Sequence, residues 1–136
     1  MIRVVLDTNV LISVILSKGK PYELFMKAVS KKFVLVVSDL LLKEFEGVIR
    51  RPKFKFTDEE LCEISYSLRQ SAEIVEVVSK FNIVSRDFKD DIILETTYDG
   101  KADFIVSGDD HLLSLNSFRA INIVSVKEML TYLENF

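Results

Sequence analysis

Two carboxylates in this 136-residue sequence come after apolar runs of the kind that form buried strands. Asp7 directly follows Ile2 to Leu6, and Asp109 comes two residues after Asp103 to Ser107. In an open parallel sheet, the working site lies outside the carboxyl ends of the strands. If both runs are parallel strands, these two acids lie at that edge.

Three further acids stand on segments expected to be helical near the same edge. Asp90 and Asp91 open one helical pattern, and Glu44 lies about one and a half turns into another. Carboxylates brought together repel each other unless a cation sits between them, and oxygen ligands select a hard ion. We therefore predict that Asp7, Glu44, Asp90 and Asp109 hold Mg²⁺ or Mn²⁺. Asp91 is an alternative to Asp90, which could also serve simply as a helix N-cap.

Ions held in this way bind substrate phosphates and lower the pKa of a bound water, so no histidine base is needed. The predicted chemistry is hydrolysis of a phosphodiester. The chain has one histidine, His111, and one cysteine, Cys62, which disfavours histidine-rich and cysteine-based metal sites. Cys62 falls on an apolar helical stripe, and we expect its thiol to be buried.

Apolar runs alternate with helical patterns along the chain. Strands are expected over 2–6, 33–37, 74–78, 103–107 and 121–124, and helices over 8–17, 21–30, 39–50, 58–71, 90–99, 110–115 and from 126 onward. Ser38 is a candidate N-cap, and Thr57 with Glu60 and Ser125 with Glu128 are candidate capping boxes. This alternation predicts an α/β fold, a three-layer α/β/α sandwich with a mainly parallel central sheet. We expect residues 1–136 to form one domain.

The composition, 49% hydrophobic and 29% charged, excludes disorder as the main state. No apolar run approaches the roughly 20 residues of a membrane span. Asp7 interrupts the apolar N-terminal stretch, which disfavours a signal peptide. We therefore expect a cytoplasmic protein with no membrane partner.

The net charge of −3 is unevenly distributed. Residues 1–56 carry eleven basic and five acidic residues, whereas residues 57–136 carry seven basic and sixteen acidic ones. Within the first part, a basic stretch beside Glu44 is predicted to contact nucleic-acid phosphates through Lys43, Arg50, Arg51 and Lys53. The alternative is a solvated helix end whose cations interact with the helix dipole.

Four segments resemble those of PIN-domain nucleases and occur in the family's order. They are VVLDTNV at 4–10, SDLLLKEF at 38–45, RDFKDD at 86–91 and ADFIVSGD at 102–109. The resemblance extends over about residues 2–130. It implies an α/β/α sandwich and a Mg²⁺- or Mn²⁺-dependent endoribonuclease, here selective for single strands, that leaves a 5′-phosphate and a 3′-hydroxyl.

Carried over by position, the resemblance assigns the metal-binding catalytic acids to Asp7, Glu44, Asp90 and Asp109. It also implies that Asn9 supports the first acid and that Ser107 is the polar residue near the fourth. Phe88 stands where relatives usually have proline, and Thr96-Thr97 replaces a pair of small residues. Neither departure removes an acid.

The chain resembles the VapC-like toxins of toxin–antitoxin pairs. This implies an RNA substrate, an antitoxin protein as a candidate partner, and a homodimer. The rival hypothesis is a PIN-like module that binds RNA or protein without cutting. A Rossmann domain is excluded because the glycine-rich turn is absent, and a haloacid-dehalogenase-like domain is disfavoured because position 9 is Asn rather than Asp.

Overall fold

The computed structural model describes residues 1–80 and 88–135, with the side chains of residues 88–90 outside that description. Its strands are β1 (Arg3–Leu6), β2 (Val34–Ser38), β3 (Ala72–Val75), β4 (Phe104–Val106), β5 (Ser117–Phe118) and β6 (Ile121–Val124). They form a sheet in the order β3-β2-β1-β4-β6-β5. Neighbouring strands pair in parallel, except for β5 and β6, which are antiparallel. The predicted mainly parallel sheet is confirmed.

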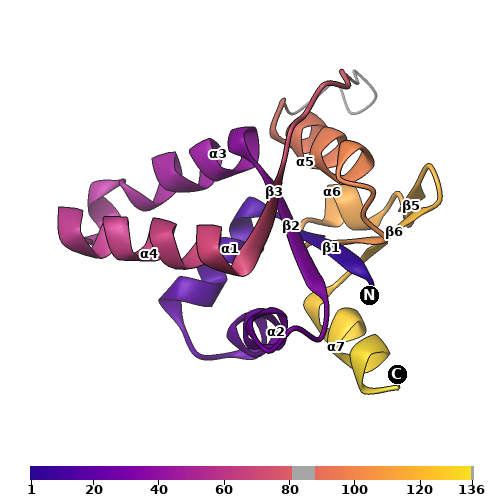
Figure 1. Ribbon diagram of the computed structural model, residues 1–136, viewed down its shortest axis with the longest axis horizontal. Helices are drawn as coiled ribbons and strands as arrows, with labels where there is room; N and C mark the ends of the chain where they lie inside the picture. The colour runs from indigo at the N-terminus through magenta and orange to yellow at the C-terminus, as the bar shows by residue number, and fades with distance from the viewer. Residues whose placement is uncertain (81–87, 136) are drawn as a thin grey trace.

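Helices cover both faces of this sheet. They are α1 (Thr8–Leu16), α2 (Lys20–Val29), α3 (Asp39–Ile49), α4 (Asp58–Ser71), α5 (Phe88–Asp99), α6 (Asp110–Leu113) and α7 (Val126–Glu134), with a short 3₁₀ turn, η1 (Pro52–Phe54). In Figure 1, α3 and α5 lie above the strands and α2 and α7 lie below them. The predicted α/β/α layers are therefore present. Among the described residues, no helix is both long enough and apolar enough to cross a bilayer.

The central strands are buried on both faces, as their unbroken apolar runs predicted. Val4, Val5 and Leu6 of β1 are fully buried, as are Ile105 and Val106 of β4. They belong to a core cluster that also includes side chains from β2 and from the helices on both faces. Burial of this apolar area supplies the main driving force that holds the strand ends, and the polar residues following them, in fixed positions.

The predicted helix starts are also present. The Ser38 hydroxyl accepts a hydrogen bond from the Leu41 amide at 3.1 Å and caps α3. Both capping boxes form, at the start of α4 and at the start of α7. These contacts satisfy backbone amides that a helix N-terminus leaves without intrahelical partners.

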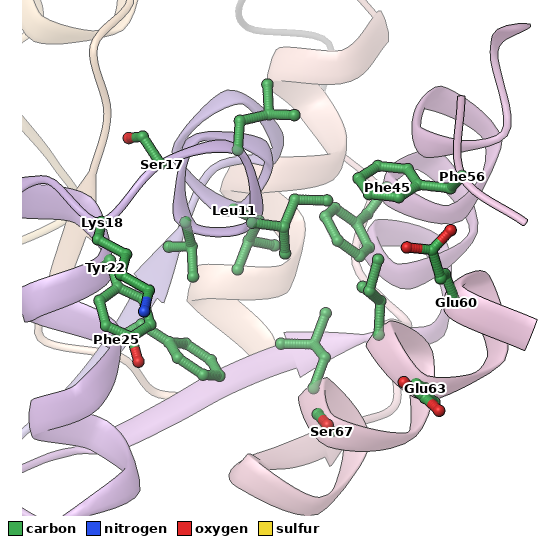
Figure 2. Close-up of a pocket in the computed structure, with 15 residues that line it drawn as sticks. Leu11, Ser17, Lys18, Tyr22, Phe25, Phe45, Phe56, Glu60, Glu63 and Ser67 are labelled. Atoms are coloured by element: carbon green, nitrogen blue, oxygen red, sulfur yellow. The ribbon is translucent and has the colours of Figure 1, made fainter. Parts of the chain in front are cut away.

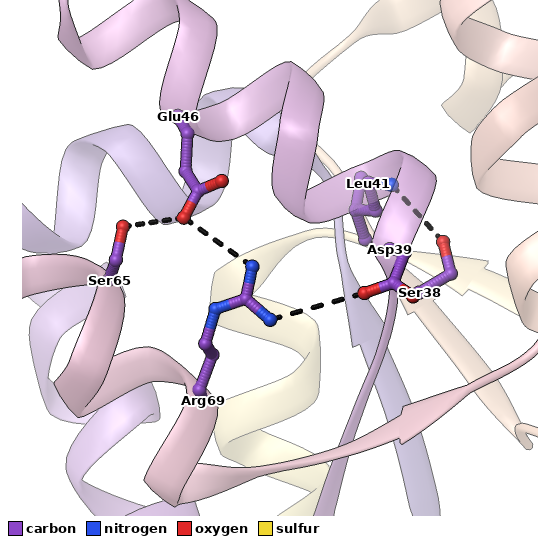
Figure 3. A network of polar contacts seen from close by, with 6 residues as sticks. All are labelled: Ser38, Asp39, Leu41, Glu46, Ser65 and Arg69. Atoms are coloured by element: carbon purple, nitrogen blue, oxygen red, sulfur yellow. Dashed lines mark hydrogen bonds and ion pairs between the residues drawn. The ribbon is translucent and has the colours of Figure 1, made fainter.

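Helices α3 and α4 are joined by a network of polar contacts (Figure 3). The Arg69 guanidinium lies 3.6 Å from Glu46 and 3.9 Å from Asp39, and the Ser65 hydroxyl donates to Glu46 at 2.6 Å. Each exposed ion pair is worth only a fraction of a kcal/mol. Together they connect α4 to α3 at the surface.

Two strand predictions need correction. The third strand is β3 at 72–75 rather than 74–78, and β5 was not predicted. Among the described strands β3 pairs only with β2, so half of it faces solvent and the apolar run after Ile74 did not mark its position. β5 is two residues long, which is too short to produce a periodic pattern.

Two helix predictions also need correction. Helix α5 begins at Phe88, so Asp90 is its third residue and not its N-cap. Cys62 is exposed rather than buried, because α4 turns Leu61 and Leu68 toward the core instead.

Candidate functional site

Asp7 lies at the junction of β1 and α1. Its amide donates to the Val106 carbonyl at 3.0 Å, which places it beside the end of β4. Its carboxylate caps α1 by accepting from the Val10 amide at 2.9 Å, and the other oxygen accepts from the Ser107 hydroxyl. Only 5% of Asp7 is exposed. The end of a buried strand therefore holds a nearly inaccessible carboxylate.

Ser107 connects Asp7 to Asp109. The fully buried Ser107 hydroxyl donates to Asp7 and accepts from the Asp109 amide at 3.0 Å. Asp109 in turn caps α6 by accepting from the His111 amide at 2.9 Å. Asp109 is only partly buried, so its carboxylate remains accessible from solvent.

Glu44 reaches the same edge of the sheet from α3. That helix starts at the carboxyl end of β2, and the Thr8 hydroxyl donates to Glu44 Oε1 at 2.6 Å. The other oxygen, Oε2, is buried without a hydrogen-bond partner among the described residues. The contact joins Glu44 to the residue that follows Asp7.

Helix α5 runs antiparallel to β2 and carries Asp91 past the end of the strand. The Thr96 hydroxyl lies 2.6 Å from the Ser38 hydroxyl, while Gly100 packs against Val36. Asp91 precedes Thr96 by five residues in α5. It therefore lies about 7 Å from Thr96 along the helix axis, on the side beyond the end of β2. It is 9% exposed, and its Oδ1 has no hydrogen-bond partner within the described part of the chain. The side chain of Asp90 lies outside the described residues.

The carboxylates interact electrostatically. Burial raises the pKa of Asp7 above its ordinary value of 3.8, and the charges of Asp109 and Glu44 raise this pKa further. The hydrogen bonds from Ser107 and Val10 act in the opposite direction without cancelling the effect. The ionised form of Asp7 is therefore destabilised where it stands.

The donor chemistry of this edge fits a hard divalent cation. Its groups are carboxylate oxygens, and both Glu44 Oε2 and Asp91 Oδ1 are buried atoms that lack a partner among the described residues. Among the described side chains, which exclude that of Asp90, no three His, Cys, Asp or Glu residues stand close enough together to hold an ion as they are. The structure thus places Glu44 and Asp109 close enough to Asp7 for their charges to act on it. The three carboxylates do not form a preformed three-ligand cluster.

The other predicted residues occupy the surface. Lys43, Arg50, Arg51 and Lys53 are all exposed, Lys43 beside Glu44 and the other three where α3 ends and η1 begins. Asn9 is exposed too, and the hydrogen bonds to the first acid come from other residues. The roles assigned to these five residues stay predictions.

Sequence reasoning missed the hydroxyl groups of Thr8 and Thr96. Each binds a partner far away in sequence, at Glu44 and Ser38 respectively. The one available signal for Thr8 was its place directly after Asp7, at the first residue of α1. For Thr96, it was the unusual pair of threonines in a buried helix.

A separate apolar groove of about 580 Å³ lies between α1, α2, α3 and α4 (Figure 2). Its floor includes Leu11, Phe25 and Phe45, from α1, α2 and α3. Glu60 and Glu63 of α4 line one side, as Figure 2 shows. The groove therefore combines an apolar floor with Glu60 and Glu63 on one side and Lys18 on the other.

The sequence model of the PIN domain matches residues 3–111. The chain belongs to the PIN domain family. The matched residues include all five candidate acids: Asp7, Glu44, Asp90, Asp91 and Asp109. PIN domains are generally nucleases, so nuclease chemistry is the class of activity that this membership supports.

This PIN domain is similar to a curated protein and to solved structures of other chains, two of which follow. It is 30% identical over 133 residues to the uncharacterized protein MJ1680 of Methanocaldococcus jannaschii, covering 93% of this chain and 84% of that one. PAE2754 from Pyrobaculum aerophilum superposes with a TM-score of 0.67 at 12% identity, covering 99% of this PIN domain and 91% of that chain. VapBC2 from Rickettsia felis, bound to a DNA fragment from the promoter, superposes with a TM-score of 0.66 at 14% identity, covering 91% and 98%. Both structural likenesses support the fold.

Proposed function

We propose that this PIN domain is a metal-dependent endoribonuclease that hydrolyses phosphodiester bonds in single-stranded RNA. The observation that carries the proposal is the buried carboxylate of Asp7, whose ionised form is destabilised by burial and also by the charges of Asp109 and Glu44. Because the ionised form of Asp7 is destabilised in this way, the protein keeps this carboxylate at a cost in stability. A divalent cation would remove that cost and would give the acids a function.

Asp7 and Asp109 would hold the ion, with Glu44 and either Asp90 or Asp91 completing the site directly or through water. Mg²⁺ or Mn²⁺, when bound, supplies a water of lowered pKa and neutralises charge on the phosphate. Ser107 keeps the Asp7 carboxylate oriented by donating to one of its oxygens. The buried strand ends exclude bulk water from one side of the site, and the partly exposed Asp109 leaves the other side open to a substrate. The expected products carry a 5′-phosphate and a 3′-hydroxyl.

Cleavage of fluorescently labelled single-stranded RNA in Mn²⁺ or Mg²⁺ tests the proposal. We expect EDTA to stop the cleavage and Asp7→Asn to slow it by at least about 100-fold, because the ion would lose a charged ligand. Asp58→Asn is the matched control, since Asp58 is exposed at the start of α4, and should cut like the parent. Equal rates for Asp7→Asn and the parent would refute the assignment of the site.

Asp90→Asn and Asp91→Asn separate the two candidates for the third acid in the same assay. The buried Oδ1 of Asp91 favours that residue, whereas the family pattern matched Asp90. The acid that participates should show the larger loss of cleavage.

The rival function is binding without cutting. It would be supported if the parent bound RNA and Mn²⁺ but left the RNA intact under every metal condition. The accessible carboxylate of Asp109 and the shared electrostatic site favour the enzyme.

A partner protein of the antitoxin kind fits the apolar groove between α1, α2, α3 and α4. The VapBC2 neighbour bears the name of a toxin–antitoxin pair. An amphipathic segment with a basic margin would complement the apolar floor and the acidic Glu60 and Glu63. We also propose that the protein is a homodimer, which light scattering tests. The proposed location is the cytoplasm, which cell fractionation tests.

A further inference from the structure

The hydrogen bond between Thr8 and Glu44 joins two residues that are 36 positions apart in the sequence. Thr8 is the first residue of α1, directly after Asp7, and is 6% exposed. Its Oγ1 donates to Glu44 Oε1 at 2.6 Å. A short hydrogen bond from a buried hydroxyl to a carboxylate is a strong and directional contact.

This contact uses one oxygen of Glu44 and leaves the other one available. Oε2 is buried and has no hydrogen-bond partner in the described part of the chain. A buried carboxylate oxygen without a partner carries a desolvation penalty, and such groups need an explanation. The charge of Glu44 also raises the pKa of Asp7, so the carboxylate that carries this oxygen interacts electrostatically with Asp7.

We propose that Thr8 is a positioning residue that holds the Glu44 carboxylate in the orientation needed to bind a divalent cation. This inference rests on the proposed function of the site. A glutamate side chain has three rotatable bonds and loses conformational freedom when it is held in place. Because Thr8 fixes Oε1 before any ion arrives, less of that freedom remains to be lost on binding.

The same hydrogen bond could instead serve only to join two helices. Helices α1 and α3 pack against each other, and the Thr8–Glu44 bond lies at their junction. A purely structural link would lower the melting temperature when broken but would leave the affinity for metal unchanged. The two roles therefore differ in a measurement that requires no catalysis.

The test is titration of metal-free protein with Mn²⁺ by calorimetry, using Thr8→Val and Thr8→Ser. Valine keeps the branched shape and removes the hydroxyl, whereas serine keeps the hydroxyl. We expect Thr8→Val to raise the Mn²⁺ dissociation constant by about 10-fold, in the range seen when residues that orient metal ligands are changed. Thr8→Ser should remain within about 2-fold of the parent.

Thr97→Val is the matched control for loss of a buried hydroxyl. Thr97 is fully buried, and its hydroxyl donates to the Ile93 carbonyl of its own helix at 2.6 Å. This variant should change the melting temperature without changing the Mn²⁺ affinity. If Thr8→Val does not fold, Thr8→Ala removes the same hydroxyl without adding bulk.

Glu44→Gln and Asp7→Asn separate failure of this inference from failure of the proposed function. If both weaken Mn²⁺ binding while Thr8→Val binds like the parent, the positioning role is refuted and the metal site stands. If the parent itself binds no Mn²⁺, both the metal site and the role of Thr8 are refuted. A further loss on adding Thr8→Val to Glu44→Gln would also contradict the inference, because Thr8 is expected to act through Glu44.

Discussion

The pKa of the Asp7 carboxylate is subject to effects that act in opposite directions. Its two hydrogen bonds, from Ser107 and Val10, favour the ionised form, whereas burial and the charges of Asp109 and Glu44 oppose it. Burial and the neighbouring charges outweigh the two hydrogen bonds, so the pKa of Asp7 is raised. In the absence of metal, Asp7 is therefore a source of instability at neutral pH.

Replacing Asp7 with asparagine should stabilise the metal-free protein at neutral pH. The amide is nearly isosteric and removes the buried charge, and we expect a gain of about 1 kcal/mol, or about 4 °C in melting temperature for a domain of this size. Thermal melting in EDTA measures the gain. A variant less stable than the parent at pH 7.5 would contradict it.

The gain should depend on pH in a defined direction. Because the pKa of Asp7 is raised in the folded state, folding takes up protons above the ordinary value of 3.8, and the contribution of Asp7 to stability falls as pH rises through the folded pKa. The difference between Asp7→Asn and the parent should thus be largest at neutral pH and disappear as pH falls toward 3.8. Addition of Mn²⁺ should stabilise only the parent.

At the scale of elements, the junction between α5 and the β2–β3 pair depends on one small residue. Gly100 follows the last residue of α5, as the sequence predicted, but Lys101 takes the left-handed conformation, with φ of 54°. A Cβ on Gly100 would lie 2.6 Å from a Val36 methyl carbon and 2.8 Å from the Thr96 carbonyl oxygen. The glycine is needed for close packing.

Gly100→Ala and Gly47→Ala should therefore change stability in opposite directions. The first creates overlap with backbone and core atoms and should cost about 1–3 kcal/mol. The second adds a methyl group with nothing within 4 Å, inside α3, and should stabilise by about 0.5–1 kcal/mol. Urea unfolding measures both, and a Gly100→Ala protein as stable as the parent would show that α5 can shift away.

At the scale of the whole molecule, the cations at the end of α3 lie away from the acids, whereas the exposed Lys43 lies beside Glu44. Arg50, Arg51 and Lys53 are exposed where α3 ends, several residues beyond Glu44. Arg50, the C-cap of α3, lies about 9 Å from Glu44 along the helix axis at a rise of 1.5 Å per residue. An RNA strand cut at the acids could therefore contact these cations with a neighbouring phosphate.

If these cations contact RNA, Arg50→Gln should weaken RNA binding about 3- to 10-fold at low salt. The slope of log affinity against log salt should become less steep by about 0.7, the value for one phosphate contact on a single strand. Fluorescence anisotropy with the Asp7→Asn protein avoids cleavage during the measurement. Lys127→Gln, on α7, is the control. If the Asp7→Asn protein shows the same salt slope alone, with Arg50→Gln and with Lys127→Gln, Arg50 does not contact RNA and the cations are a solvated helix end.

The fold and the positions of the acids were largely predictable because both depend on local patterns. Apolar runs marked the buried strands, and Ser38, Thr57 and Ser125 marked helix starts through contacts with residues three positions away. Asp7 and Asp109 followed from the same rule, since parallel strands end at a common edge. The bounds of the edge strand β3 were predicted wrongly, because a strand with one partner and an exposed face needs no apolar run.

The amino-acid sequence alone specifies the mainly parallel α/β architecture and the carboxylates that follow β1 and β4, because burial and capping act over a few residues. The tertiary structure alone decided which atoms meet there. Thr8 meets Glu44, Ser107 meets Asp7, and Ser38 meets Thr96 only because distant segments pack into one core. The raised pKa of Asp7 was decided there too, because burial and neighbouring charge depend on the whole surroundings of a group and not on its place in the chain.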